Sequence, residues 1–107
     1  YCAAVVGNSS SGVVETPEFG VPCVNIGDRQ TGRLRTANVI DCPCTESAIA
    51  AAMEKALTPA FYAAAAQVEN PFYRPDASGS MLRIIKQSFA EGLLCTPKHF
   101  YDGEAAL

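Results

Sequence analysis

Short apolar runs alternate with helical patterns along the first half of the chain. Three of these runs, residues 3–6, 22–26 and 38–41, have the length and continuity of strands that are buried in a parallel sheet. The segment between the first two runs fits a short helix that Gly20 closes. Together with the helices that follow, the order β-α-β-β-α-α-α predicts an α/β fold with right-handed crossovers.

Two helical patterns follow the third strand. The first begins at Thr45, a favourable N-cap, and is rich in alanine, the best helix former. The residues expected on its apolar face are Ile49, Met53, Ala56 and Leu57. Thr58 and Pro59 end this helix and begin the next, which is predicted to reach about residue 68.

The last helix follows a rigid, proline-bounded connection over residues 70–75. Asp76 or Ser78 is expected to cap it. Its clean apolar stripe consists of Met81, Ile84, Ile85, Phe89 and Leu93. Residues 95–107 form a tail without a strong pattern.

The strand count suggests that the sequence is the end of a longer chain. Three short strands are too few for a complete doubly wound domain, so an open sheet edge is expected where earlier strands would pair. The length suits one domain, and we read residues 1–107 as a single domain. Because an open edge can pair with another chain, a homo-oligomer is expected.

The composition and net charge limit the classes of partner that the chain can bind. Of the 107 residues 49% are hydrophobic and 18% charged, which is a globular composition, and the net charge is −3. So acidic a chain has no general affinity for nucleic acid or anionic membrane, and any anion site must be local. No apolar run approaches the roughly 20 residues of a membrane span, and no signal peptide is visible. A cytoplasmic protein is expected.

The five cysteines give little reason to expect a metal or redox site. Cys2 and Cys23 lie in apolar surroundings and are interpreted as small core residues. The pair Cys42 and Cys44 could suggest metal binding, but structural zinc sites usually need a second ligand pair. The one histidine, His99, stands far from that pair. We expect reduced thiols, and neither a metal nor a cofactor.

The most informative segment is the serine loop, residues 7–12 (Gly-Asn-Ser-Ser-Ser-Gly), between the first strand and the first helix. Helix-starting N–H groups and serine hydroxyls can bind an anion, and Gly7 and Gly12 let the backbone approach it. Glu15 could accept hydrogen bonds from ribose hydroxyls. The alternative is plain helix capping, because serines are common helix caps and Gly12 and Glu15 have the spacing of an N-cap and a carboxylate three residues later. Composition and spacing leave the two interpretations about equal.

The amino-acid sequence of the serine loop and of later segments closely resembles that of the UDP-N-acetylglucosamine 2-epimerase family. The matching stretches are residues 5–12 (VVGNSSSG), Glu15, 19–22 (FGVP), 25–33 (NIGDRQTGR) and 38–40 (NVI). The likeness is greatest to the hydrolysing branch. It is dense from Val5 to about Asp41, and it continues more loosely to residue 102.

The resemblance implies two Rossmann-like halves that face each other across a cleft, the glycosyltransferase-B arrangement. This chain would be the last part of the second half, with a three-layer parallel sheet. The residues implied to bind UDP are Ser9, Ser10, Ser11, Gly12, Glu15, Arg29 and Arg33. Ser9 and Ser10 would hold the diphosphate, Glu15 the ribose, and Arg29 would face the phosphates across the cleft. Arg33 could line the same site or be solvated, and Arg35 is interpreted as solvated.

The implied reaction deprotonates C2 of the sugar of UDP-N-acetylglucosamine, eliminates UDP and adds water, giving an N-acetylmannosamine-type sugar. Its acids and bases would come mostly from the first half, so an isolated fragment should be inactive. Asp28 and Glu18 are the nearest spare carboxylates, and Asp28 fits better as a partner of Arg29 or a cap of its loop. His99 is interpreted as a surface residue. The alternatives are a non-hydrolysing epimerase, a glycosyltransferase donor domain, and a non-catalytic module.

Overall fold

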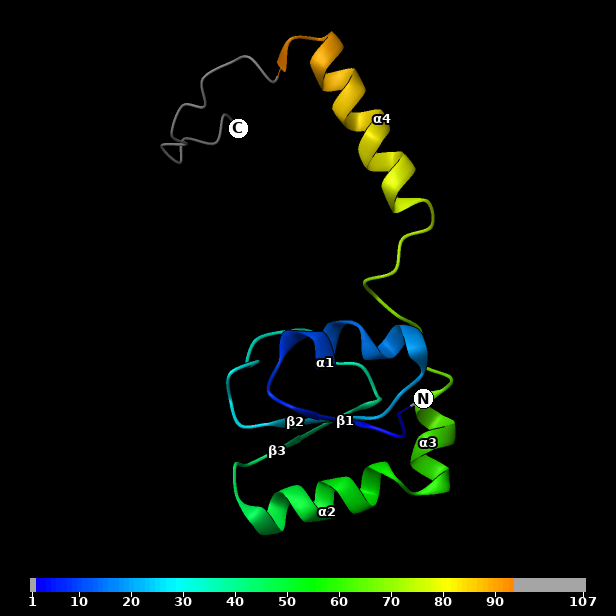
Figure 1. Cartoon of the computed structure of the whole chain (residues 1–107). Coiled ribbons are helices and arrows are strands. Elements are labelled where there is room, and N and C mark those ends of the chain that lie inside the picture. Colours follow the sequence, from blue (N-terminus) through cyan, green and yellow to red (C-terminus); the bar gives the residue numbers. More distant parts are fainter. Residues whose placement is uncertain (1, 94–107) are drawn as a thin grey trace, which may run out of the picture. The chain divides into compact units, whose positions relative to one another are not determined.

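The computed structural model describes residues 2–93 of the chain. It divides the chain into two compact units, Tyr1–Tyr73 and Arg74–Leu107. The elements of the first unit are β1 (Val5–Gly7), α1 (Ser10–Val14), the 3-10 helix η1 (Thr16–Phe19), β2 (Cys23–Ile26), β3 (Val39–Cys42), α2 (Glu46–Ala56) and α3 (Pro59–Ala65) (Figure 1). The second unit contains α4 (Ala77–Ala90). The predicted order of strands and α-helices is confirmed, while the assignment of residues 1–107 to one domain stays a prediction.

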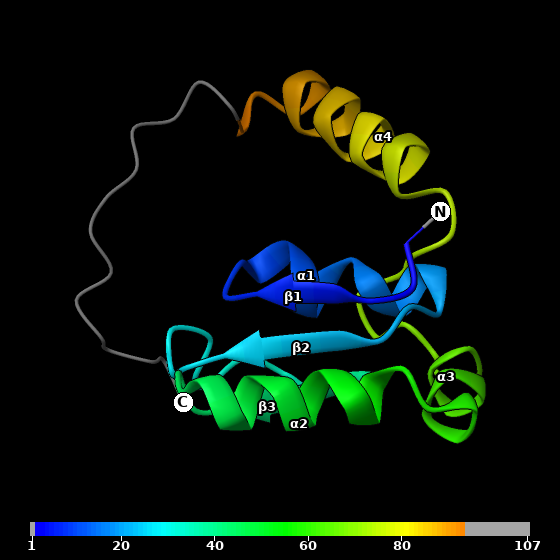
Figure 2. The same ribbon diagram turned by 60° about the horizontal axis from the view of Figure 1, so that its bottom comes forward.

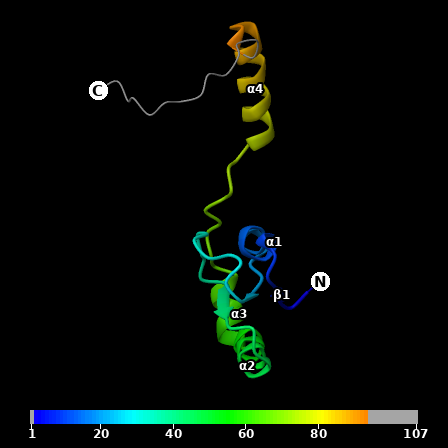
Figure 3. The ribbon, with the colours of Figure 1, turned by 90° about the vertical axis from the view of Figure 1, so that its left-hand side faces the viewer.

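The three strands form a parallel sheet in the order β1-β2-β3. Its register places Val6 beside Val24 and Asn25 beside Asp41. The arrowheads of β1 and β2 point to the same side in Figure 2. α1 covers one face and α2 the other, and both are seen end-on in Figure 3. The first unit is therefore a Rossmann-like α/β layer structure, as predicted. Within the described residues β1 pairs only with β2, which leaves the expected open edge.

The core between β2, β3 and α2 consists of small side chains. Its buried members are Val24, Cys42, Ala52 and Ala56, with Ala4, Ile26, Ile40, Ala48 and Ile49 packed against them. The predicted apolar face of α2 is right for Ile49 and Ala56 but wrong for Met53 and Leu57, which are 40% and 54% exposed. Alanines spaced four residues apart let α2 approach the sheet closely, so the longer side chains lie outside that contact.

The single helix predicted before Gly20 is two elements. α1 starts at Ser10, directly after its N-cap Ser9, and η1 follows it from Thr16. Pro17 has no N–H for an α-helical bond to residue 13, so the chain continues as a 3-10 turn. Gly20 closes η1 in the left-handed conformation, with φ of 60°.

The later helices begin as predicted. The Thr45 and Thr58 side chains accept hydrogen bonds from the N–H groups of Ala48 and Phe61. α3 ends at Ala65, short of the predicted limit. Asp76 occupies the N-cap position of α4, without a side-chain cap hydrogen bond. The whole predicted stripe of α4 is exposed, and that helix buries no residue. The predicted tail over residues 95–107, with His99, lies outside the described residues.

Candidate functional site

Three loops meet at one edge of the sheet because the carboxyl ends of parallel strands lie together. The serine loop follows β1. The arginine loop, residues 27–35, follows β2, and residues 43–45 follow β3. The strand order thus assembles the candidate site from segments that are far apart in sequence.

The serine loop starts α1 in a defined way. Ser9 is the N-cap, and its side chain accepts a hydrogen bond from the Ser11 N–H at 3.4 Å. The hydroxyl-bearing residues Ser9 and Ser11 are exposed, whereas Ser10 is half-buried. Gly12 is buried, and a Cβ there would lie 3.0 Å from the Cys23 Sγ. Gly12 therefore allows α1 to pack against β2, a role that the sequence did not suggest.

Glu15 lies at the opposite end of this short helix. It is the C-cap of α1, where its N–H donates to the Ser11 carbonyl. Gly12 is therefore not the N-cap that the capping alternative assigned to it, whereas its other part, capping by a serine, is seen at Ser9. The Glu15 side chain is exposed.

The arginine loop contacts the serine loop through one acceptor residue. The Gln30 Nε2 donates to the Asn8 carbonyl at 2.8 Å, and Gln30 is 3% exposed. The Arg29 Nη1 lies 3.3 Å from the same carbonyl and 3.5 Å from the Asn8 Oδ1. Arg29 is exposed and has no carboxylate partner within residues 2–93. The structure thus brings the guanidinium beside the serine loop of its own unit.

Arg35 is the part of the loop for which the prediction is wrong. It is paired rather than solvated: its Nε donates to the Asp41 Oδ1 and Oδ2 at 3.2 and 3.1 Å. Its Nη1 and Nη2 donate to the carbonyls of Arg33 and Gln30 at 2.9 and 2.8 Å. A planar guanidinium can serve several acceptors at once, which is why Arg35 is held in place.

Asp41 is fixed from two strands. Asn25, buried in β2 beside it, donates to the Asp41 Oδ1 at 2.6 Å. Partial burial is the largest influence on this carboxyl and raises its pKa. The hydrogen bonds from Asn25 and Arg35 and the charge of Arg35 together outweigh burial, so the pKa of Asp41 lies below its ordinary value. The carboxylate is therefore held in its charged form.

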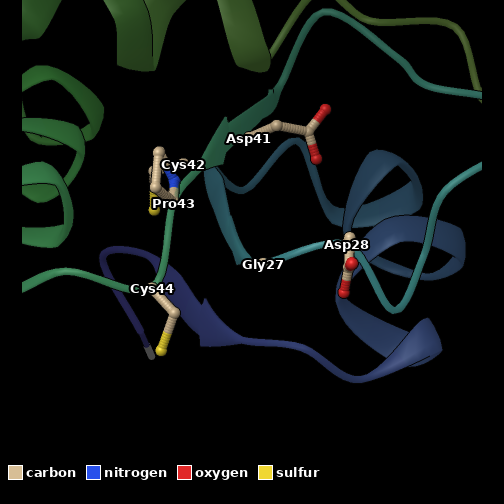
Figure 4. Close-up of a pocket in the computed structure, with 6 residues that line it drawn as sticks. All are labelled: Gly27, Asp28, Asp41, Cys42, Pro43 and Cys44. Atoms are coloured by element: carbon tan, nitrogen blue, oxygen red, sulfur yellow. The ribbon is translucent and has the colours of Figure 1, made fainter.

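Two adjoining pockets open at this edge. One, of about 520 Å³, is lined by Gly27, Asp28, Asp41, Cys42, Pro43 and Cys44. In Figure 4 the carboxylates of Asp28 and Asp41 lie on one side of this pocket, and Pro43 and the two cysteines lie on the other. The second, of about 410 Å³, shares Gly27, Asp28 and Asp41 and adds Thr31, Gly32, Arg33 and Arg35. Arg33 lines this second pocket and is exposed, and its role in binding stays a prediction.

The spare carboxylates lie apart from each other. Asp28 lines both pockets, and its carbonyl accepts the Thr31 N–H at 2.8 Å. Glu18 instead accepts a hydrogen bond from the Asn70 Nδ2 at 2.8 Å. The geometry brings Asp28, but not Glu18, to the edge where the loops meet.

The described cysteines are free thiols. Cys23 is buried, as predicted, and burial raises the pKa of its thiol to about 11, with Asp41 adding to the shift. Cys2 is exposed, so its assignment to the core is wrong. Within residues 2–93 no group of three or more His, Cys, Asp or Glu is arranged to hold a metal ion. The same residues contain no helix that is long and apolar enough to cross a membrane.

Sequence reasoning missed Asn8, Gln30, Asn25 and Asp41 as parts of this arrangement. In a polar loop, the sequence alone does not distinguish a buried amide such as Gln30 from its exposed neighbours. The pairing of Asn25 with Asp41 could have been found from the register of the two strands, since each occupies the same place in its apolar run.

The fold and the three-loop edge define a Rossmann-like α/β unit of the kind that binds ligands at the carboxyl ends of its strands. The model of the family described as UDP-N-acetylglucosamine 2-epimerase matches residues 1–86. The chain therefore belongs to this family.

Curated relatives agree with this assignment. The polysialic acid biosynthesis protein P7 of Escherichia coli is 38% identical over 102 residues, which are 95% of this chain and 26% of the relative. A GDP/UDP-N,N′-diacetylbacillosamine 2-epimerase (hydrolyzing) of Campylobacter jejuni is 68% identical over 38 residues, 36% of this chain and 10% of that protein. A UDP-N,N′-diacetylbacillosamine 2-epimerase (hydrolyzing) of Legionella pneumophila is 45% identical over 53 residues, 50% of this chain and 14% of that protein. The chain spans about a quarter of the length of the first of these relatives.

Proposed function

We propose that this chain is the UDP-binding portion of a hydrolysing UDP-N-acetylglucosamine 2-epimerase. The observation that carries the proposal is the position of Arg29. Its guanidinium lies within 3.5 Å of Asn8 in the serine loop and has no carboxylate partner among the described residues. An uncompensated positive charge beside a helix-starting loop favours a bound anion.

The proposed roles follow the layout of the serine loop. Ser9, Ser10 and Ser11 supply hydroxyl and backbone donors for the diphosphate, and the Arg29 fork pairs with its oxygens. Gly12 lies in the first turn of α1 and would contribute to the site through its backbone. Glu15, exposed at the far end of the same short helix, accepts hydrogen bonds from the ribose hydroxyls. Arg33, which lines the second pocket, adds positive charge to the same anionic site.

The proposed reaction uses this site to hold the leaving group. A base removes the proton from C2 of the sugar, and the C1–O bond to UDP breaks to give a 2-acetamidoglucal. Water then adds, and the net products are free N-acetylmannosamine-type sugar and UDP. Charge develops on the departing diphosphate, so donors at the serine loop stabilise that step. The acids and bases are expected in another part of the complete protein, which leaves this fragment inactive by itself.

Binding can be tested with arginine variants of the complete gene product. Arg29→Ala should weaken UDP binding about ten- to hundredfold, since hydrogen bonds to charged groups contribute about 1.5–3 kcal/mol. Arg83→Ala removes a guanidinium from α4 and should leave the affinity unchanged. Titration calorimetry with UDP measures both. Equal affinities of the two variants and the unmodified protein would contradict the role of Arg29.

The products decide the type of enzyme. The complete gene product should be given UDP-N-acetylglucosamine and, because two relatives are named for it, UDP-N,N′-diacetylbacillosamine. Free sugar together with UDP is expected. Formation of UDP-N-acetylmannosamine would instead identify a non-hydrolysing epimerase, and transfer of sugar to an added acceptor a glycosyltransferase. The cytoplasmic location and the homo-oligomer expected from the sequence belong to the same proposal.

A further inference from the structure

Arg35 connects the arginine loop to the end of the sheet. Its guanidinium is shared between the Asp41 carboxylate in β3 and the backbone carbonyls of Gln30 and Arg33. The arginine side chain is 26% exposed. Four donor contacts from one rigid group leave residues 30–35 little freedom relative to β3.

Gln30 carries this restraint to the serine loop. Its carbonyl accepts from the Arg35 Nη2 at 2.8 Å, and its side chain donates to the Asn8 carbonyl at 2.8 Å. Because Gln30 is buried, water competes little for the second bond. The path from Asp41 to Asn8 therefore runs through contacts that are each 3.2 Å or shorter.

Arg29 is held much less directly. Its contacts with Asn8, at 3.3 and 3.5 Å, are longer than that of Gln30. An exposed side chain with such contacts depends on its backbone for position, and that backbone is attached to Gln30. The place of the Arg29 guanidinium beside the serine loop thus depends on the contacts of the next residue.

Asp41, from which this path of contacts starts, is itself held in place. Asp41 accepts from Asn25 at 2.6 Å, and Asn25 is 1% exposed and occupies the neighbouring register position in β2. Asp41 also remains half-exposed at the pockets, so its contact with Arg35 lies at the site and not in the core. A pair that served only to stabilise the sheet would not need to reach the carbonyls of the arginine loop.

We propose that Arg35 and Asp41 are positioning residues that act through Gln30 to set the arginine loop, and with it Arg29, against the serine loop for a nucleoside diphosphate. This inference rests on the proposed function. Neither Arg35 nor Asp41 needs to touch the nucleotide. The pair preorganises the donors, so the loop does not have to be ordered when the ligand binds.

The test uses Asp41→Asn, Arg35→Gln and the double variant in the complete gene product, which together form a double-mutant cycle. Asp41→Asn keeps the shape of the side chain and removes its charge. Each single variant should weaken UDP binding about five- to thirtyfold, and the double variant should be no weaker than the worse single one, because both changes break one contact. Leu34→Ala, at an exposed position of the same loop, should bind as the unmodified protein does.

A second measurement needs no nucleotide. In amide NMR spectra without UDP, Asp41→Asn should shift or broaden the signals of residues 8–11 and of the Arg29 side chain, whereas Leu34→Ala should not. Unchanged signals there would overturn the proposal, as would unchanged UDP affinity in both single variants of a folded protein. Failure of the unmodified protein to bind UDP would overturn the proposed function and the nucleotide part of this inference, while the spectra would still decide whether the loops are coupled.

Discussion

Asn38, just before β3, joins three segments through one buried amide. Its Nδ2 donates to the Thr16 Oγ1 at 2.9 Å and to the Val21 carbonyl at 2.8 Å. Its Oδ1 accepts from the Thr36 hydroxyl at 2.6 Å, and the side chain is 0% exposed. The start of η1, the approach to β2 and the start of β3 are thereby linked. A buried amide with all these partners stabilises the unit, because its removal would leave each partner without that hydrogen bond.

Asn38→Ala should lower the free energy of unfolding by about 2–3 kcal/mol, since it leaves buried polar groups unpaired. Urea denaturation followed by circular dichroism measures the change. Gln67→Ala removes an exposed amide of similar size and should change stability by less than about 0.5 kcal/mol. A loss below about 1 kcal/mol for Asn38→Ala would show that water replaces these hydrogen bonds.

Asp41 gives the first unit a defined response to acid. Its pKa in the folded protein lies below the ordinary 3.8, so the unfolded state takes up the proton first as the pH falls. The stabilisation is complete above about pH 3.8 and is lost as the pH falls through the lower pKa of the folded state. Asp41→Asn should therefore lose less stability between pH 5 and about pH 3 than the unmodified chain does. Urea midpoints at several pH values test this, and equal losses would contradict it.

The elements themselves could be predicted from the sequence where one local rule decides them. Thr45 and Thr58 signal helix starts by capping, and both are observed. The split of the first helix at Pro17 and the burial of Ala52 in place of Met53 could not be read from the pattern. The first depends on a choice between α and 3-10 turns. The second depends on how closely a helix approaches its sheet, and periodicity does not determine that distance.

Gly20 shows how the end of an element depends on its neighbour. It adopts φ of 60°, and a Cβ there would lie 2.9 Å from the Cα of Ala66, a backbone atom that cannot easily move. Gly20→Ala should cost about 2–4 kcal/mol, because the clash adds to the roughly 1–2 kcal/mol of a left-handed non-glycine residue.

Gly32→Ala provides the matched control. Gly32 has φ of 82°, but no atom lies within 4 Å of the place that a Cβ would occupy, so only the backbone term should appear. Denaturation midpoints of the two variants give the difference directly. Equal costs would mean that α3 shifts to accommodate the methyl group.

At the scale of the whole molecule, the resemblance implied that the serine loop and Arg29 serve the same diphosphate, but the sequence did not show how the two loops are held together. The parallel strands bring the serine and arginine loops to one edge of the sheet, and the amino-acid sequences of both loops indicated the family. The contacts that join them involve Gln30 and Arg35, whose partners lie 22 and 6 residues away. Such pairs depend on loop conformation and strand register together, which no local pattern specifies.

The last helix differs from the rest of the described chain in what it buries. α4 has 14 residues and none is buried, whereas Val24 in the first unit is 0% exposed. Helices of this length are marginal in water without tertiary packing, and Gly79 in its first turn lowers its propensity further. In the 107-residue chain we therefore expect α4 to open far more often than the sheet does.

Hydrogen exchange can measure this difference within one sample. Amides of α4 should exchange within about tenfold of the rates of an unstructured peptide, while those of β2 should be protected up to the global free energy of unfolding. Val24→Ala should cost about 2 kcal/mol or more and speed exchange throughout the sheet, because it leaves a cavity in the core. Ile84→Ala on the exposed stripe should leave sheet exchange unchanged, because its side chain is 60% exposed. Protection of α4 equal to that of β2 would mean that its apolar stripe is covered in solution, since hydrogen bonds within a helix of this length cannot supply such stability alone.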